Sequence, residues 1–290
     1  IVKEFENRGI ELFRQEGRVG KTYTQNKAVE RARGEIILFS DATTMYQPDV
    51  LEVVLPNFAD SSVGCVAGRL VYVNKDEATV GKGTQSYWGY ETFIKTSESA
   101  ACSLIGVSGC LYAVRRSAYI PMYPEACSDF LICTVLYRQG LRSVYEPAAV
   151  CTEDTNTRTD KEFQMRVRII SQTFTDLWRN RDMLNPFKSG FFAVQLFSHK
   201  LLRYLVPIFL VTIFISTAVL ANFSRMYAAL LALQVGFYLL AALTYLLERR
   251  AIRSKLLSAS LYFVLANLSS AVGLFKFLSG ERYVRWEPNR

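Results

Sequence analysis

Asp41 follows the apolar run Glu35-Ile-Ile-Leu-Phe-Ser40 and is the first candidate for chemistry. Ligands gather at the carboxyl ends of strands in open α/β sheets. A carboxylate there can bind a hard divalent cation, which in turn binds phosphate oxygens. Strand-end aspartates also often cap the turn that follows. Both interpretations, metal ligand and turn cap, stay open for Asp41.

A basic loop, Arg18-Val-Gly-Lys-Thr22, precedes this run. Its Gly-Lys-Thr triplet resembles part of a phosphate-binding P-loop, but that motif needs a glycine where this sequence has Gln15. We therefore reject an ATPase. The loop either faces a diphosphate or forms a solvated turn.

Asp129 is the third candidate, because it opens the predicted helix that runs to Gln139. An aspartate in a partly buried pocket can act as a general base. An aspartate at this place can equally be a helix N-cap. The local sequence does not choose between these roles.

The cysteines and the histidine do not form a metal site in the sequence. No Cys-x-x-Cys pair occurs and His199 is the only histidine, whereas structural zinc sites use paired ligands. We expect all six cysteines to be reduced and mostly buried in a cytosol-facing domain. They are Cys65, Cys102, Cys110, Cys127, Cys133 and Cys151.

Alternating strands and helices over residues 1 to about 155 predict the α/β layer domain that positions these candidates. Residues 35–40 read as a short buried parallel strand. The helix before it ends at Gly34, a plausible residue to follow a helix. The other predicted strands are Val63–Gly68 and Leu141–Tyr145, and the predicted helices are Thr22–Arg33, Pro48–Phe58 and Asp129–Gln139.

Residues 157–185 have a different character. Apolar side chains recur at helical spacing, whereas arginines fall largely on other faces, which is typical of a basic amphipathic helix on a membrane surface. An ordinary surface helix of the α/β domain is the alternative. The apolar set is Phe163, Val167, Ile170, Phe174 and Leu177, and the basic set is Arg166, Arg168, Arg179 and Arg181.

Three uncharged stretches follow, at residues 204–224, 226–247 and 256–275. Each is close to the roughly 20 apolar residues that cross a bilayer as a helix. Basic clusters before the first stretch and after the second predict that both lie in the cytoplasm. The tail after the third stretch is basic too, so it is expected in the cytoplasm. Three full crossings would instead place this tail on the opposite side of the membrane. The polar residues Asn267, Ser269 and Ser270 favour partial insertion of the third stretch.

Composition excludes two classes of protein. A chain with 50% hydrophobic residues is not disordered. Its 34 basic and 26 acidic residues give a net charge of +8, but the basic residues cluster beside the apolar stretches. Anionic lipid headgroups explain this charge better than nucleic acid does, so we expect no nucleic-acid partner.

In this order, the motifs resemble those of membrane-embedded family 2 glycosyltransferases, the relatives of cellulose, hyaluronan and poly-N-acetylglucosamine synthases. The resemblance covers nearly the whole chain. The matching segments are Gly17-Arg-Val-Gly-Lys21 with Asn26, Gly34–Ala42 with Asp41, Ser108-Gly-Cys-Leu-Tyr-Ala-Val-Arg-Arg116, Ser128-Asp129, Gln164-Met-Arg-Val-Arg168, Ser198–Arg203 and Trp286-Glu-Pro-Asn-Arg290.

The resemblance implies a partial GT-A (Rossmann-like) nucleotide-sugar domain, followed by an interfacial amphipathic helix and a small all-α transmembrane bundle. It implies inverting transfer from a nucleotide-sugar, with a UDP-sugar as the expected donor, to a growing polysaccharide or lipid-linked acceptor. Asp41 would hold Mg²⁺ or Mn²⁺ and Asp129 would be the catalytic base. Substrate would be bound by Arg18, Lys21, Asn26, Gly109, Gln164, Arg166, Arg168 and Trp286.

Three positions depart from the family pattern. Thr43 replaces the second metal-binding aspartate, Ser128 replaces an acidic partner of the base, and Ile169 replaces a tryptophan after Arg168. The family's first strand and nucleotide-binding segment are not found, so we expect an amino-terminally truncated fragment. These departures keep a non-catalytic membrane scaffold or transport partner as the alternative.

The expected organisation has four parts. Residues 1–156 form the partial catalytic domain, 157–203 the interfacial helices, 204–278 the transmembrane segments and 279–290 a cytoplasmic-looking tail. We expect a multi-pass protein of the cell (inner) membrane, in contact with membrane lipids, with its catalytic domain in the cytoplasm.

Overall fold

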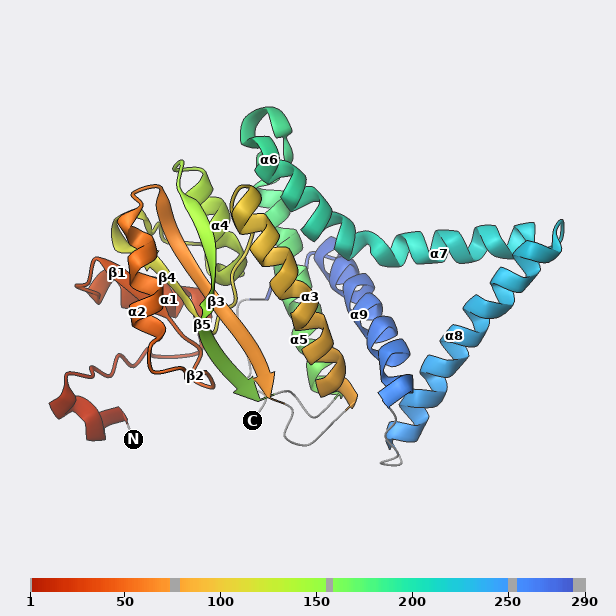
Figure 1. The fold of residues 1–290 in the computed structure, drawn as a ribbon, viewed down its shortest axis with the longest axis horizontal. Helices are drawn as coiled ribbons and strands as arrows, with labels where there is room; N and C mark the ends of the chain where they lie inside the picture. Colours follow the sequence, from red (N-terminus) through yellow and green to blue (C-terminus); the bar gives the residue numbers. More distant parts are fainter. Residues whose placement is uncertain (1, 74–78, 155–158, 250–254, 284–290) are drawn as a thin grey trace.

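The computed structural model describes residues 2–73, 79–154, 159–249 and 255–283 of the 290-residue chain. A mixed sheet domain lies at one end, and long helices extend from it to the other (Figure 1). The amino-terminal part begins with the short helix η1 (Val2–Arg8) and the helix α1 (Lys21–Arg31).

The sheet has five strands in the order β1-β4-β3-β5-β2. Only the central β3 and β5 pair in parallel, with Ala67 opposite Tyr145, and the other neighbours are antiparallel. The strands are β1 (Ile36–Phe39), β2 (Met45–Tyr46), β3 (Val63–Val73), β4 (Tyr112–Arg115) and β5 (Arg142–Asp154).

The prediction of a buried parallel strand at residues 35–40 is wrong in its direction and its burial. β1 pairs antiparallel with β4, with Ile37 opposite Val114, and only Phe39 of this strand is buried. A short apolar run indicates a strand, but it does not specify the direction of the neighbouring strand.

Two apolar cores sandwich the sheet, as an α/β layer domain requires. Cys65 and Ala67 of β3 face the core under α4 (Ser128–Tyr137), whereas Val66 and Leu70 face the core under α2 (Val50–Val54). This alternation follows from the two-residue period of a strand. The short helices η2 (Leu55–Ala59) and η3 (Arg116–Ala118) complete the domain, and the predicted helices over 22–33, 48–58 and 129–139 are confirmed to within a few residues.

Helix α5 (Thr159–Arg179) packs along α9 (Lys255–Leu278), which also contacts α3 (Thr79–Ala101) (Figure 1). Its apolar stripe is buried inside the protein: Val167, Ile170, Phe174 and Leu177 are each 4–5% exposed. The interpretation that this stripe faces a membrane surface is therefore wrong. Periodicity reveals an apolar face, but not the surface that covers it.

An exposed apolar surface lies on α6 (Pro186–Leu196) and η5 (Phe197–Leu202), which follow the short helix η4 (Arg181–Leu184). Phe187 is 97% exposed, and beyond the kink at Gly190 the residues Phe191, Val194 and Phe197 form an exposed stripe at helical spacing. Among the residues that the structure describes, three helical stretches are long and apolar enough to cross a membrane: Pro186–Leu220, Arg225–Leu247 and Ala259–Leu278. They contain the three predicted stretches nearly in full.

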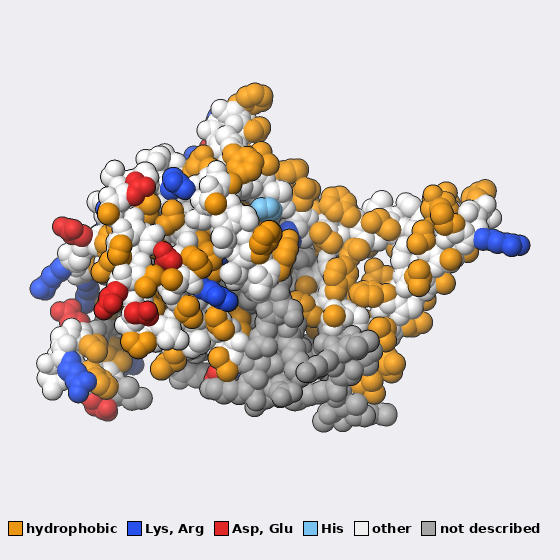
Figure 2. All heavy atoms as spheres, viewed as in Figure 1, with side chains coloured by type: hydrophobic (Ala, Val, Ile, Leu, Met, Phe, Trp, Pro, Cys, Tyr) orange, Lys and Arg blue, Asp and Glu red, His pale blue; other side chains and the backbone are white. Residues whose placement is uncertain are grey.

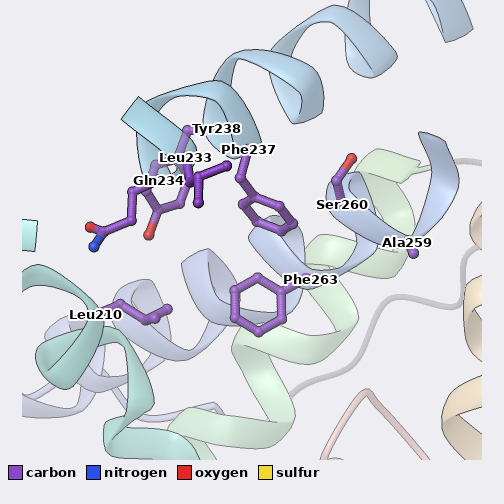
Figure 3. A pocket seen from close by; sticks show the side chains of 8 residues that line it. All are labelled: Leu210, Leu233, Gln234, Phe237, Tyr238, Ala259, Ser260 and Phe263. Atoms are coloured by element: carbon purple, nitrogen blue, oxygen red, sulfur yellow. The ribbon is translucent and has the colours of Figure 1, made fainter. Parts of the chain in front are cut away.

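The helices α7 (Arg203–Leu220), α8 (Arg225–Arg249) and α9 lie along the three sides of a triangle (Figure 1). Apolar side chains cover the outer surface of α7 and α8, whereas charged side chains gather over the sheet domain (Figure 2). A groove of about 580 Å³ lies between the three helices, with Leu210, Phe237 and Phe263 in its walls (Figure 3). Its lining is almost wholly apolar, in keeping with helices that face lipid.

Candidate active site

Three side chains that the sequence singled out, those of Lys21, Asp41 and Asp129, meet above a fourth such residue, Gly109. Lys21 Nζ lies 2.8 Å from Asp41 Oδ1. A Cβ atom added to Gly109 would lie 2.7 Å from Lys21 Nζ and 3.0 Å from both Asp41 Oδ2 and Asp129 Oδ2. One ammonium and two carboxylates therefore converge on a spot that only a glycine leaves open.

The elements explain this convergence. Asp41 lies just beyond β1, and Gly109 lies just before β4, the strand paired with β1, so the sheet brings them together. Lys21 is the first residue of α1, after Gly20 with its φ of 95°, a conformation that favours glycine. Asp129 lies in the first turn of α4. Two loops and two helix starts thus supply one site at the sheet edge.

Asp129 is half-buried, and its pKa lies below the usual range. Burial alone would raise this pKa, but the charge of Lys21, the Asp129 amide, the Cys127 thiol and the charge of Arg168 together outweigh that effect. The pKa of Lys21 is raised: burial opposes the shift, and the charges of Asp129 and Asp41 more than offset it. The site therefore holds an ionised carboxylate beside a fixed cation.

Two further cations lie around the site. Arg168 of α5 interacts with the charges of Asp129 and Asp41; burial nevertheless lowers its pKa. Lys95 of α3 is buried and its Nζ donates a 2.8 Å hydrogen bond to Ser108 Oγ, next to Gly109. Arg168 thus brings positive charge to the carboxylates, whereas Lys95 holds the residue next to Gly109.

Asn26 holds α1 in place instead of facing the site. Its Nδ2 donates to the Met122 carbonyl at 2.6 Å, and its Oδ1 accepts from the Tyr119 hydroxyl at 2.8 Å. Thr22 Oγ1 adds a 2.7 Å bond to the Ala126 carbonyl. Asn26 therefore fixes the helix that carries Lys21.

The remaining predicted substrate-binding residues are not brought to this point. Arg166 pairs with Glu162 at 2.8 Å and donates to the Tyr262 hydroxyl of α9. Gln164 is exposed on α5, and Arg18 is exposed in the loop before α1. Trp286 lies outside the described residues.

A divalent metal fits this site only with a second source of oxygen ligands. Asp41 Oδ1 is bonded to Lys21, while its Oδ2 points over Gly109. Thr43 and Thr44 donate instead to Glu153 Oε1, at 3.2 and 2.6 Å. Within the described ranges, no group of three or more His, Cys, Asp or Glu residues could hold a metal. Mg²⁺ is commonly bound by one or two carboxylates together with substrate phosphates, so Asp41 suits that arrangement.

The six cysteines are free, as predicted, and all except the half-buried Cys102 are buried. Two buried polar side chains were not predicted from the sequence. They are Lys95 of α3 and the wholly buried Asp176 of α5. The signal available for Asp176 was its place between Phe174 and Leu177, two residues of the apolar stripe.

The sequence is similar to those of known glycosyltransferases. Residues 1–121 match the family described as Glycosyl transferase family 2. An N-acetylglucosaminyltransferase of Neorhizobium galegae is 27% identical over 175 residues, 54% of this chain and 40% of the relative. A protein of the same name from Mesorhizobium japonicum is 25% identical over the same shares of each chain. The chain thus spans about two fifths of the length of these curated relatives.

One solved structure is similar over 97% of this chain and 74% of its own, with a TM-score of 0.70 and 19% identity. It is the mannosyltransferase PcManGT from Pyrobaculum calidifontis, in complex with GDP-Man and Mn²⁺. At this identity the likeness shows the fold: a GT-A-like, Rossmann-type domain with a curled mixed sheet, followed by apolar helices.

Proposed function

We propose that the chain transfers a sugar from a nucleotide-sugar to an acceptor at a membrane, because residues 1–121 match the family described as Glycosyl transferase family 2 and the fold is GT-A-like. The observation that carries the proposal is the convergence of Lys21, Asp41 and Asp129 over Gly109. It supplies a base, a cation and a possible metal ligand within a few ångströms of one another.

In the proposed reaction, Asp129 takes the proton from an acceptor hydroxyl. The acceptor oxygen forms a bond to the anomeric carbon, while the bond from that carbon to the diphosphate breaks and the diphosphate leaves with the electron pair. One displacement inverts the anomeric centre. The ionised state of Asp129 suits a base that must be unprotonated before the acceptor arrives.

Lys21 lies where it can neutralise the leaving diphosphate, with Arg168 as a second cation. Fixed charges aimed at developing negative charge are commonly the largest contribution to the rate. Asp41 would hold Mg²⁺ or Mn²⁺ together with the donor phosphates, and the metal would supply Lewis-acid neutralisation. The Mn²⁺ in the mannosyltransferase complex supports this choice of ion.

The name shared by the two relatives favours an N-acetylglucosamine donor, so UDP-N-acetylglucosamine is the first donor to assay. GDP-mannose is the comparison, because it is the donor bound by the similar solved structure. A growing polysaccharide and a lipid-linked acceptor both suit a site beside apolar helices. Product size on a gel separates these two acceptors.

The membrane placement differs from the one that the sequence alone predicted. We propose that α6, rather than α5, is the interfacial helix, because Phe187 and the stripe from Phe191 to Phe197 are exposed and lie shortly before α7. Residues 1–156 would form the catalytic domain, on the cytoplasmic side of the cell (inner) membrane. The basic residues before α7 support this orientation.

The test is Asp129→Asn, assayed for sugar transfer and for donor binding in the full chain in detergent or membranes. Loss of a general base should lower the rate by about 10²–10⁴-fold. Donor affinity should stay close to that of the unchanged protein. Asp182→Asn is the control, because Asp182 forms an exposed ion pair with Arg138, at 2.7 Å, away from the site. Equal activity of the Asp129→Asn variant and the unchanged protein would rule out the proposed base.

A further inference from the structure

One face of α5 holds the loop that leads to Asp129. Gln172 Nε2 donates to the Glu125 carbonyl at 3.4 Å. Asp176 Oδ2 accepts from the Cys127 amide at 3.0 Å. These side chains are four residues apart, so they lie on the same face of the helix.

Arg179, three residues further along, completes this face. Its guanidinium carbon lies 4.1 Å from the ring centroid of Tyr123, and its Nη1 lies 3.6 Å from Glu125 Oε2. The segment from Tyr123 to Cys127 is therefore held by three successive side chains of one helix. Asp129 follows this segment by two residues.

Asp176 is the central member of this face. It is wholly buried, and both of its oxygens are used: Oδ1 accepts from the Tyr123 hydroxyl and Oδ2 from the Cys127 amide. Burial raises the pKa of Asp176 to about 7, although the two hydrogen bonds work against this. A buried carboxyl group is costly unless it is hydrogen-bonded, and here every bond goes to the loop before the base.

The same loop is held from its other side by α1. Thr22 binds the Ala126 carbonyl and Asn26 binds the Met122 carbonyl. Since α1 also carries Lys21, and α5 also carries Arg168, the loop lies between the helices that supply two of the cations around the site. Its position fixes the distance from Asp129 to Lys21 and Asp41.

We propose that Asp176 is a positioning residue for the transfer reaction, which holds Asp129 in place through the Cys127 amide and the Tyr123 hydroxyl. The proposal rests on the role of Asp129 proposed above. If Asp176 had a purely structural role, its loss would lower stability and would affect turnover and donor binding alike. If Asp176 positions Asp129, its loss lowers turnover and leaves donor binding nearly unchanged. A misplacement of about 1 Å can reduce a rate by roughly 100-fold.

The experiment compares Asp176→Ala and Asp176→Asn in the full chain. Asn keeps an oxygen for the Cys127 amide and offers an NH₂ group to the Tyr123 oxygen, whereas Ala loses both bonds. We expect Asp176→Ala to lower kcat by about 10–100-fold, with donor Kd changed less than about twofold, and Asp176→Asn to restore most of kcat. Thr175→Ala is the matched control, because Thr175 is equally buried but its hydroxyl bonds only to the Ser171 carbonyl of its own helix.

Hydrogen exchange of the peptide around residues 120–130 tests the loop independently of activity. We expect faster exchange in Asp176→Ala, but not in Asp176→Asn or Thr175→Ala. Unchanged kcat in Asp176→Ala, or equal loss in both Asp176 variants with unchanged exchange, would overturn the proposal. If Asp129→Asn stays fully active, the base assignment fails instead, and the exchange data still report whether Asp176 anchors the loop.

Discussion

Gly109 has no side chain, yet at the scale of single residues it determines how closely the charged groups approach. The atoms that a Cβ would meet are the ends of Lys21, Asp41 and Asp129. These are the groups that the proposed reaction uses. Space at Gly109 is therefore a requirement of the site rather than of the fold.

Gly109→Ala should reduce transfer by about tenfold or more, because the added methyl group displaces reacting groups that need close alignment. Thermal stability should change little, since Lys21 and Asp41 each keep 40% of their side chains exposed and can move aside. Initial rates and a thermal melt measure both effects. Gly89→Ala is the control, because a Cβ there has no neighbour within 4 Å. Full activity of Gly109→Ala would argue against a reaction centre at this point.

Lys21→Met should shift the acid limb of the rate profile to higher pH. The charge of Lys21 is the largest influence that lowers the pKa of Asp129, so without it burial raises that pKa. A base with a higher pKa becomes protonated, and inactive, at a higher pH. The measurement is kcat against pH at saturating donor.

Lys27→Met is the control for this shift, since Lys27 is exposed on the same helix and pairs with Glu30 at 2.9 Å. Its acid limb should coincide with that of the unchanged protein. Coincident acid limbs in Lys21→Met and the unchanged protein would mean that Lys21 does not tune the base.

The sequence singles out four residues that lie together in the structure, Lys21, Asp41, Gly109 and Asp129, because each stands at or near the start or end of an element. It predicts hydrogen-bond partners poorly. Asn26 and Arg166 have side chains suited to binding phosphate or sugar, but tertiary packing pairs Asn26 with backbone near Met122, and Arg166 with Glu162 and Tyr262. No local pattern contains that information.

At the scale of elements, α5 connects the sheet domain to the apolar helices. Its apolar stripe was visible in the sequence, but the surface that covers it was not, because α9 follows about 80 residues later. The sequence also failed to predict α3, whose glycine, serine and threonine residues give no clear helical period. Both errors concern long helices whose neighbours are distant in the sequence.

At Gly273, α9 packs closely against α5. A Cβ there would lie 2.8 Å from Ile170 Cγ2 and 3.1 Å from the Val167 carbonyl. Gly273→Val should therefore lower the free energy of unfolding by about 1–3 kcal/mol through overpacking. Thermal melts in detergent measure the loss.

Gly236→Val in α8 is the matched control, because a Cβ at Gly236 has no neighbour within 4 Å. Adding Ile170→Ala to Gly273→Val should recover part of the lost stability, since it removes the atoms that clash. Equal melting temperatures for the two valine variants would contradict close packing of α5 on α9.

At the scale of the whole molecule, the position of α9 bears on the number of crossings. Gln172 of α5 donates to the Tyr283 carbonyl at 3.0 Å, so the chain after α9 lies against a helix of the sheet domain. Arg166 bonds to Tyr262 near the beginning of α9, so the two helices lie side by side over much of their length. A helix with the charges of α5 does not lie in hydrocarbon. We therefore expect α7 and α8 to cross the membrane, and α9 to stay on the side of the sheet domain.

Cysteine labelling in sealed membrane vesicles distinguishes the two topologies. Phe223→Cys is placed in the turn between α7 and α8, where Phe223 is 81% exposed, and Ser279→Cys just after α9. Met45→Cys on β2, where Met45 is 72% exposed, marks the side of the sheet domain. If α9 does not cross, an impermeant thiol reagent should reach the cysteines at 279 and 45 from one side and the cysteine at 223 from the other. Labelling of 279 and 223 from the same side would mean that α9 crosses, and the contacts between α5 and α9 would then need to rearrange in the membrane.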